Sequence, residues 1–143
     1  MRLFQKTKDG GAESTVDAFF LCEFKGLFSI ALLRFNKGSR NNFHPHAFDA
    51  FTWFLKGDMT EHRILDGEVV KRKYKRSILP KITKKDNMHK VMAHKTSWCF
   101  TIRGPWSKEW QEVDLTQDKL ITLTHGRKVV GEDEANLKEI VNA

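Results

Sequence analysis

Two histidines one residue apart, His44 and His46, lie in the stretch NNFHPHAFDAFTWFLKG, residues 41–57. We interpret residues 43–55 as a strand, because the stretch is apolar and aromatic and ends at a Lys-Gly turn. Side chains at positions i and i+2 of a strand point the same way, with Cα atoms roughly 6–7 Å apart. Two imidazoles placed like this can reach one metal ion at about 2.1 Å each. The spacing therefore predicts a metal site.

A third ligand must come from another part of the chain, and His89 is the best candidate. It follows the polar pair Asp86-Asn87 and lies in a later predicted strand. An isolated His-x-His pair is a weak motif, however. The alternative is a structural or assembly protein whose histidines pack in its core.

The elements that would position these histidines are predicted to be strands. Phe accounts for 11 of the 143 residues, and aromatic residues favour strands. Residues 97–103 alternate between two sets of side chains, which indicates a strand with one buried face. Two hairpins are predicted, one from residues 16–24 and 27–35 and one from residues 59–65 and 68–76 around Asp66-Gly67. Residues 119–130 are interpreted as one bent strand.

The length of the chain suits one domain with one core. We expect a flexible lead-in over residues 1–15, a β-barrel over residues 16–130 and a C-terminal helix over residues 131–143. The helix is predicted because acidic residues precede apolar residues that share one helical face. About eight short strands in one domain favour an all-β sandwich or a jelly-roll barrel.

The net charge of +7 suits either nucleic acid or a small anionic substrate. The most basic run, KRKYKR at residues 71–76, is interpreted as an exposed edge strand, where lysines discourage aggregation. No alternating aromatic residues accompany this run, so binding of nucleic acid is not favoured.

Two residue patterns concern the compartment of the protein. Cys22 and Cys99 are far apart in apolar runs, which predicts two buried free thiols. The first 15 residues lack an apolar core of signal-peptide length, and no apolar run reaches the roughly 18 residues of a membrane span. We therefore expect a cytoplasmic protein without membrane contact.

Residues 38–57 resemble the first motif of the cupin superfamily, in which Gly38, His44, His46 and Gly57 fall in register. Residues 89–110 resemble the second half of small, uncharacterised cupin-like proteins of phages and bacteria. The resemblance implies a single-domain jelly-roll β-barrel that holds a metal inside through His44, His46 and His89.

The sequence departs from this motif at the usual glutamate, which would fall at Ala50 or Phe51. Neither side chain can bind a metal. Asp49 is adjacent, but in a regular strand it faces away from the two histidines unless a bulge redirects it. Three versions stay open: a three-histidine site, a site that includes Asp49, and a site in which Asp49 only orients a ligand imidazole.

The three-histidine version resembles the site of the thiol dioxygenases within the cupins. We therefore expect a divalent transition metal, with iron first and zinc, nickel and manganese as alternatives. The expected function is that of a metal-dependent enzyme of the non-haem iron oxygenase type, a dioxygenase, that acts on a small polar or anionic substrate. The alternatives are a metal-dependent isomerase of a sugar or sugar phosphate, and a non-catalytic binding module for a nucleotide or nucleic acid.

Two further residues are candidates for contact with the substrate. Arg103, at the end of a predicted strand, could clamp an anionic group in its planar fork. Trp106 could form an aromatic wall at the barrel mouth, or it could cap the core. The apolar residues 16–35 could form the interface of a homodimer, or they could be core.

Overall fold

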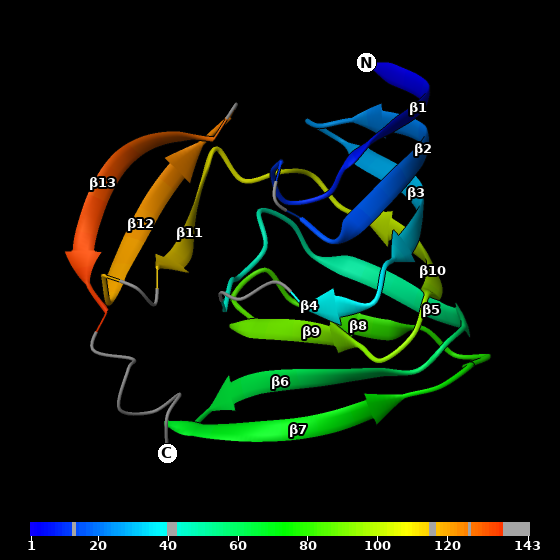
Figure 1. Ribbon diagram of the computed structural model, residues 1–143. Coiled ribbons are helices and arrows are strands. Elements are labelled where there is room, and N and C mark those ends of the chain that lie inside the picture. The colour runs from blue at the N-terminus through cyan, green and yellow to red at the C-terminus, as the bar shows by residue number, and fades with distance from the viewer. Residues whose placement is uncertain (13, 40–42, 115–116, 126, 136–143) are drawn as a thin grey trace.

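The computed structural model describes residues 1–12, 14–39, 43–114, 117–125 and 127–135. These residues contain strands and no helix, and the strands form three sheets (Figure 1). The prediction of an all-β protein is therefore confirmed. The three sheets are not closed into a barrel, so that part of the prediction is wrong.

The largest sheet has six strands in the order β1-β2-β3-β10-β5-β8. Their bounds are β1 Arg2–Lys8, β2 Val16–Phe24, β3 Phe28–Phe35, β10 Ser97–Arg103, β5 Ala50–Lys56 and β8 Lys81–Thr83. A second sheet has the order β4-β9-β6-β7, with β4 Gly38–Ser39, β9 His89–Ala93, β6 Met59–Leu65 and β7 Glu68–Tyr74. Both predicted hairpins are confirmed as β2–β3 and β6–β7.

The main core joins these two sheets through apolar side chains from both of them. Ala18, Leu33 and Cys99 come from the six-stranded sheet, and Met59 and Ala93 come from the four-stranded sheet. The predicted alternation of β10 is confirmed, because every second residue from Ser97 to Arg103 is buried. The buried face of β10 is the polar one, Ser97, Cys99, Thr101 and Arg103, so this strand brings polar groups to the interior.

The first fifteen residues were expected to be a flexible lead-in, and this expectation is wrong for residues 2–8. They form β1, which pairs with β2 along its length. Ion pairs join the two strands, from Arg2 to Glu23 at 3.3 Å and from Lys8 to Asp17 at 3.0 Å. The side chains of β1 are nearly all exposed, which is why its composition resembles that of a loop.

The third sheet consists of β11 Glu109–Asp114, β12 Lys119–Thr124 and β13 Lys128–Glu134, and it lies to one side of the other two (Figure 1). Residues 119–130, expected as one bent strand, are thus parts of two antiparallel strands. Residues 131–134 belong to β13 and not to the expected C-terminal helix. Pairing with β12 and an ion pair of 2.9 Å between Lys119 and Glu132 favour the strand. The rest of the expected helix, residues 136–143, lies outside the described residues.

The cysteines and the search for membrane spans complete this description. Both cysteines are free thiols, as predicted, but only Cys99 is buried and Cys22 is half-buried. Burial raises the pKa of the Cys99 thiol to about 12. In the part of the chain that the structure describes, no helix is long and apolar enough to cross a membrane.

Gly57, which follows β5, is the one of the described glycines at which a side chain should cost most. Its φ is +128°, and a Cβ atom there would lie 2.6 Å from the Cα atom of Ser97. We expect Gly57→Ala to lower the free energy of unfolding by about 3 kcal/mol or more, measured by urea denaturation. The control is Gly26→Ala, whose Cβ would meet nothing within 4 Å and should cost less than about 1 kcal/mol. Equal stability of the two variants would contradict this packing.

Candidate metal centre

The segment that carries His44 and His46 is not the regular strand expected over residues 43–55. The strand β5 begins only at Ala50. Pro45 has no N–H to donate to a ladder, and it lies between the two histidines. The residues on either side of Pro45 form backbone hydrogen bonds with two different residues. His44 pairs with His89, and His46 N–H donates to Lys85 O at 2.9 Å.

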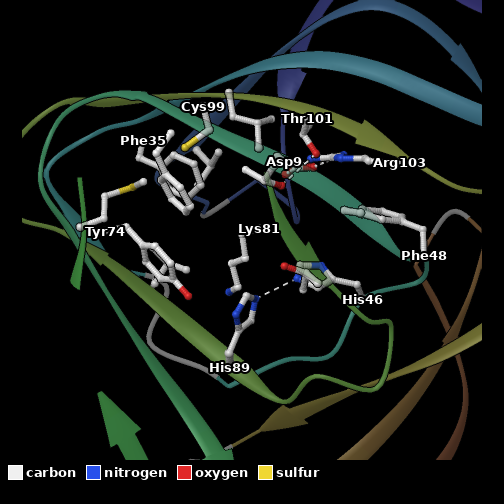
Figure 2. A pocket seen from close by; sticks show the side chains of 18 of the residues that line it. Asp9, Phe35, His46, Phe48, Tyr74, Lys81, His89, Cys99, Thr101 and Arg103 are labelled. Carbon is white, nitrogen blue, oxygen red and sulfur yellow. Dashed lines mark hydrogen bonds and ion pairs between the residues drawn. The ribbon is translucent and has the colours of Figure 1, made fainter. Parts of the chain in front are cut away.

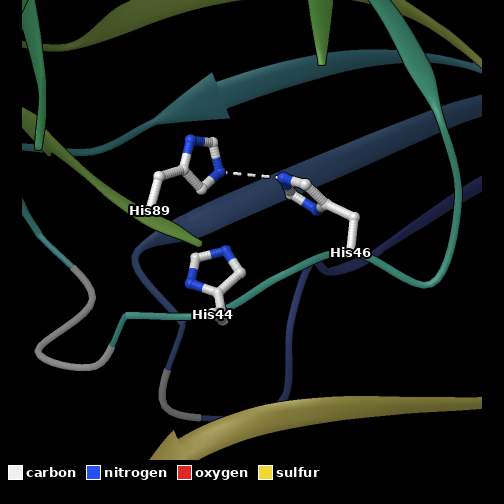
Figure 3. A group of neighbouring side chains, drawn as sticks. All are labelled: His44, His46 and His89. Carbon is white, nitrogen blue, oxygen red and sulfur yellow. Dashed lines mark hydrogen bonds between the residues drawn. The ribbon is translucent and has the colours of Figure 1, made fainter. Parts of the chain in front are cut away.

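An isolated antiparallel bridge places His44 directly opposite His89, the first residue of β9. Each residue donates its N–H to the carbonyl of the other, at 2.9 and 3.1 Å. Directly opposed residues in an antiparallel pair project to the same face. The bridge therefore brings the imidazole of His89 beside those of His44 and His46, as the sequence predicted (Figure 3).

The three rings point toward a common centre. The Nε2 atoms of His46 and His89 are 2.8 Å apart, and the potential ligand atoms of all three residues lie within 4.8 Å of one another. Two nitrogens bound to one ion at about 2.1 Å are roughly 3.0–3.4 Å apart in octahedral or tetrahedral geometry, and at most about 4.2 Å apart. The widest pair would therefore need to close by up to about 0.6 Å if its nitrogens lie on opposite sides of the ion, and by up to about 1.4 Å in tetrahedral geometry. This donor set fits one transition-metal ion.

Packing holds all three of these rings. His44 and His89 are buried. The ring of His46 stacks on Phe48 at 5.5 Å between centroids and an interplanar angle of 27°. Phe48 in turn belongs to the second core cluster, which includes Trp110 and Leu123 of the third sheet. The β11–β13 sheet thus supports the ring of His46 through Phe48.

Glu61 is a functional candidate that the sequence analysis missed. It is 3% exposed, and its Oε1 accepts a hydrogen bond from Nδ1 of His89. A donor at Nδ1 leaves the lone pair of His89 on Nε2, which is the atom that faces His46. The sequence contained one indication of this role. Glu61 is an acidic residue two positions after Met59, which places it on the inward face of the predicted strand 59–65.

The carboxylate of Glu61 has three further donors, of which Asn87 Nδ2 is the longest contact, at 3.4 Å from Oε1. Lys81 Nζ donates to Oε1, and the hydroxyl of Tyr74 donates to Oε2 at 2.7 Å. Burial alone would raise the pKa of Glu61, but the hydrogen bond from His89 and the charge of Lys81 outweigh it and hold the pKa below its ordinary value. Burial lowers the pKa of Lys81 and raises that of Tyr74. The pKa of His89 is also lowered, chiefly by burial, which favours the neutral imidazole that a metal requires.

Asp49 does not join the histidines. Its Oδ1 accepts a hydrogen bond of 2.8 Å from the backbone N–H of Lys85, and its Oδ2 lies 3.3 Å from Lys84 Nζ. The hydrogen bond from Lys85 lowers the pKa of the carboxyl group. The side chain is 46% exposed, so the geometry favours the three-histidine version of the site.

A cavity of about 100 Å³ lies between the two main sheets, with His44, His46 and His89 in its wall. Figure 2 shows His46, Phe48 and Arg103 on one side of this cavity, and Phe35, Tyr74 and Cys99 on the other. Arg103 thus reaches the cavity, and its contact with a substrate stays a prediction. Its guanidinium already forms a bidentate pair with Asp9, at 3.0 and 2.7 Å.

Trp106 does not line this cavity. Its ring packs against the outer side of Phe48 at 5.3 Å and against Trp110 at 5.7 Å, and Lys25 Nζ lies over it at 4.6 Å. Its position is that of a residue that covers the second core cluster. A role in contact with the substrate stays a prediction.

No protein-family model matches this sequence, and no curated protein matches it. Solved structures do match the fold. One is an RmlC-like cupin from Shewanella frigidimarina NCIMB 400, with 12% identity over 71% of this chain and 84% of that chain and a TM-score of 0.53. Another is a sugar phosphate isomerase from a cupin superfamily, from Silicibacter pomeroyi, with 12% identity over 84% and 76% of the two chains and a TM-score of 0.56.

A third similar structure is the Fe(II) form of HppE. It shares 10% identity over 69% of this chain and 55% of that chain, with a TM-score of 0.54. At 10–12% identity these likenesses concern the fold alone. Only one of the three descriptions names a reaction, that of a sugar phosphate isomerase, so the site itself must carry any argument about function.

Metal binding should depend on the three histidines and not on Asp49. We expect the purified protein to bind one Co²⁺ per chain, with affinity reduced at least tenfold in His46→Ala and His89→Ala. His62→Ala and Asp49→Asn are the matched controls and should change the affinity less than about threefold. Isothermal titration and the visible absorption of Co²⁺ measure both effects. Loss of binding in Asp49→Asn would instead place that carboxylate among the ligands.

Glu61 should tune the metal affinity through His89. We expect Glu61→Gln to reduce the affinity for Co²⁺ by about 10–100-fold, because the amide accepts the Nδ1–H hydrogen bond less strongly than a carboxylate does. Glu68→Gln on the exposed edge strand β7 is the control. Unchanged affinity in a folded Glu61→Gln variant would show that this hydrogen bond does not support the metal ligand.

Proposed function

We propose that this chain, whose fold is that of the cupin superfamily as residues 38–57 and 89–110 predicted, is a metal-dependent enzyme that oxidises a small molecule with dioxygen. One observation carries the proposal. Among the described residues, three imidazoles from two segments converge beside a cavity, and no carboxylate belongs to the group. Three neutral ligands leave coordination positions for other molecules.

Iron is the metal that we propose first, with zinc, nickel and manganese as alternatives. Histidine nitrogen suits all of these metals to some degree, so the ligands do not select among them strongly. When bound, iron would supply the one-electron chemistry that dioxygen needs in order to react with a closed-shell molecule. In a dioxygenation both oxygen atoms enter the product, so the reaction needs no external reductant.

The residues around the site would prepare it in three ways. Glu61 fixes the orientation and tautomer of His89. Phe48, which belongs to the second core cluster, holds the ring of His46 by stacking on it. Lys81 balances the charge of Glu61 and the hydroxyl of Tyr74 donates a hydrogen bond to it, so the carboxylate stays ionised although it is buried.

An isomerase of a sugar or sugar phosphate is the enzymatic alternative, and the fold is similar to one protein with that description. Such a reaction needs a base that exchanges a proton with the substrate. The buried carboxylate beside the histidines, Glu61, already accepts hydrogen bonds from His89, Lys81 and Tyr74. This engagement favours oxidation over isomerisation.

Nitric oxide tests the proposed open site without knowledge of the substrate. We expect the protein to bind one Fe²⁺ per chain under argon and then to bind nitric oxide, with the half-integer-spin EPR signal of an iron–nitrosyl complex. The signal should be absent in His46→Ala and present in His62→Ala. Stoichiometric iron that gives no nitrosyl signal would contradict an open oxygen-activating site.

The third alternative, a binding module for a nucleotide or nucleic acid, predicts a different result. Strand β7 and the residues after it carry Lys71, Arg72, Lys73, Lys75 and Arg76 at the exposed edge of the four-stranded sheet. If this is the functional surface, single-stranded DNA should bind at roughly 50 mM salt, should be released as salt rises, and should be unaffected by His46→Ala. Fluorescence anisotropy measures this binding, and its absence would exclude the alternative.

A further inference from the structure

We infer that the cavity beside the three histidines takes a small molecule with a hydrocarbon body and one metal-ligating group, and that it does not take a phosphorylated molecule. The inference rests on the proposed metal-dependent function and names the substrate class of the same site. The anionic group of the substrate would then bind the metal, and not Arg103 as the sequence predicted.

The first argument is that the cations of the cavity already have partners. Both terminal nitrogens of Arg103 donate to the carboxylate of Asp9, at 3.0 and 2.7 Å. The guanidinium carbon lies 4.7 Å from the ring centre of Phe48 and 5.6 Å from that of Phe20, which fixes its position. A phosphate would have to compete with Asp9 for the planar fork of Arg103.

Lys81, the other cation in the cavity wall, is paired in the same way. Its Nζ donates to the buried carboxylate of Glu61, and its own side chain is only 16% exposed. Moving Lys81 onto a phosphate would leave Glu61 buried with one donor fewer, which costs free energy. Because the pairs Asp9–Arg103 and Glu61–Lys81 are each neutral, these side chains add no positive charge to that of the metal for a dianion to bind.

The second argument is the apolar surface at the far end of the cavity. Its polar end holds the histidines and Arg103, whereas Phe35 and Cys99 lie on the opposite side (Figure 2). The apolar part is lined by Val16, Leu33, Phe35, Phe54, Met59, Val91 and Cys99. The hydroxyls of Thr52 and Thr101 lie between the two ends and bond to each other at 3.2 Å. A sugar would leave its own hydroxyls without partners against this surface.

The third argument is size. The cavity of about 100 Å³ is smaller than the roughly 150 Å³ that holds a benzene molecule in a buried apolar site. A body of about four heavy atoms therefore fits with its ligating group on the metal. Burial of each CH₂ group should improve the affinity about fourfold, so the length and branching of the body should govern binding.

A carboxylate series tests this inference on the Co²⁺-loaded protein. We expect the affinity, measured by the visible absorption of Co²⁺, to rise about fourfold per carbon from acetate through propanoate and butanoate to 3-methylbutanoate. Inorganic phosphate and glyceraldehyde 3-phosphate should bind at least tenfold more weakly than 3-methylbutanoate. A flat series, or tighter binding of either phosphate, would overturn the inference while the metal site stands.

Two variants extend the same experiment. Val91→Phe should fill the apolar end and lower the affinity for 3-methylbutanoate at least tenfold, with the affinity for acetate unchanged within about twofold. The exposed Val129→Phe is the control and should change neither affinity.

Asp9→Asn should release Arg103 and raise the affinity for inorganic phosphate at least tenfold. Phosphate affinity that stays the same in folded Asp9→Asn would contradict the argument from paired charges.

Failure of the proposed function would give a different result from failure of the inference about the substrate. Co²⁺ stoichiometry is measured before any carboxylate is added. Absence of bound Co²⁺ in the wild-type chain would overturn the metal-dependent function and this inference together. Bound Co²⁺ without the expected preference among carboxylates and phosphates would overturn only the inference about the substrate.

Discussion

The antiparallel bridge between His44 and His89 is the interaction on which the site depends. Its two hydrogen bonds, of 2.9 and 3.1 Å, join a segment interrupted by Pro45 to the first residue of β9. Without it, the His-x-His pair would have no fixed relation to a third ligand 43 positions along the chain from His46. The hydrogen bond from His46 to Lys85 then fixes the second ligand against the same stretch of chain. Two short backbone contacts thus set the geometry of three imidazoles.

The buried charges around this bridge form a second constraint. A buried carboxylate is stable only with donors around it, and Glu61 has His89, Lys81 and Tyr74. Arg103 and Asp9 satisfy each other in the same cavity. Because these pairs are balanced, a divalent ion on the histidines would dominate the local electrostatics. The same balance that stabilises the fold would therefore direct an anionic ligand toward a metal bound by the histidines.

Local patterns in the sequence predicted the parts of this structure that depend on local rules. The Asp66-Gly67 hairpin formed because both residues accept positive φ, at 51° and 81°. The alternation over residues 97–103 predicted a strand with one buried face. Two segments were predicted wrongly because strand pairing outweighed their composition. Strand β1, expected to be a flexible lead-in, pairs with β2, and the acidic start of the expected helix pairs with β12. Propensity is a weak guide where a neighbouring strand supplies the hydrogen bonds.

The sequence by itself determined the all-β class, because residue type and strand periodicity are local properties, and the likeness of residues 38–57 and 89–110 to cupin motifs indicated the three imidazoles. It could not determine which acid serves the site. Asp49 is close to the histidines in sequence, yet it bonds to Lys84 and Lys85 at the surface. Glu61 is far from them in sequence, yet it reaches His89 because β6 and β9 are neighbours in one sheet. Only the tertiary structure decided this, because strand pairing brings together residues that sequence separates.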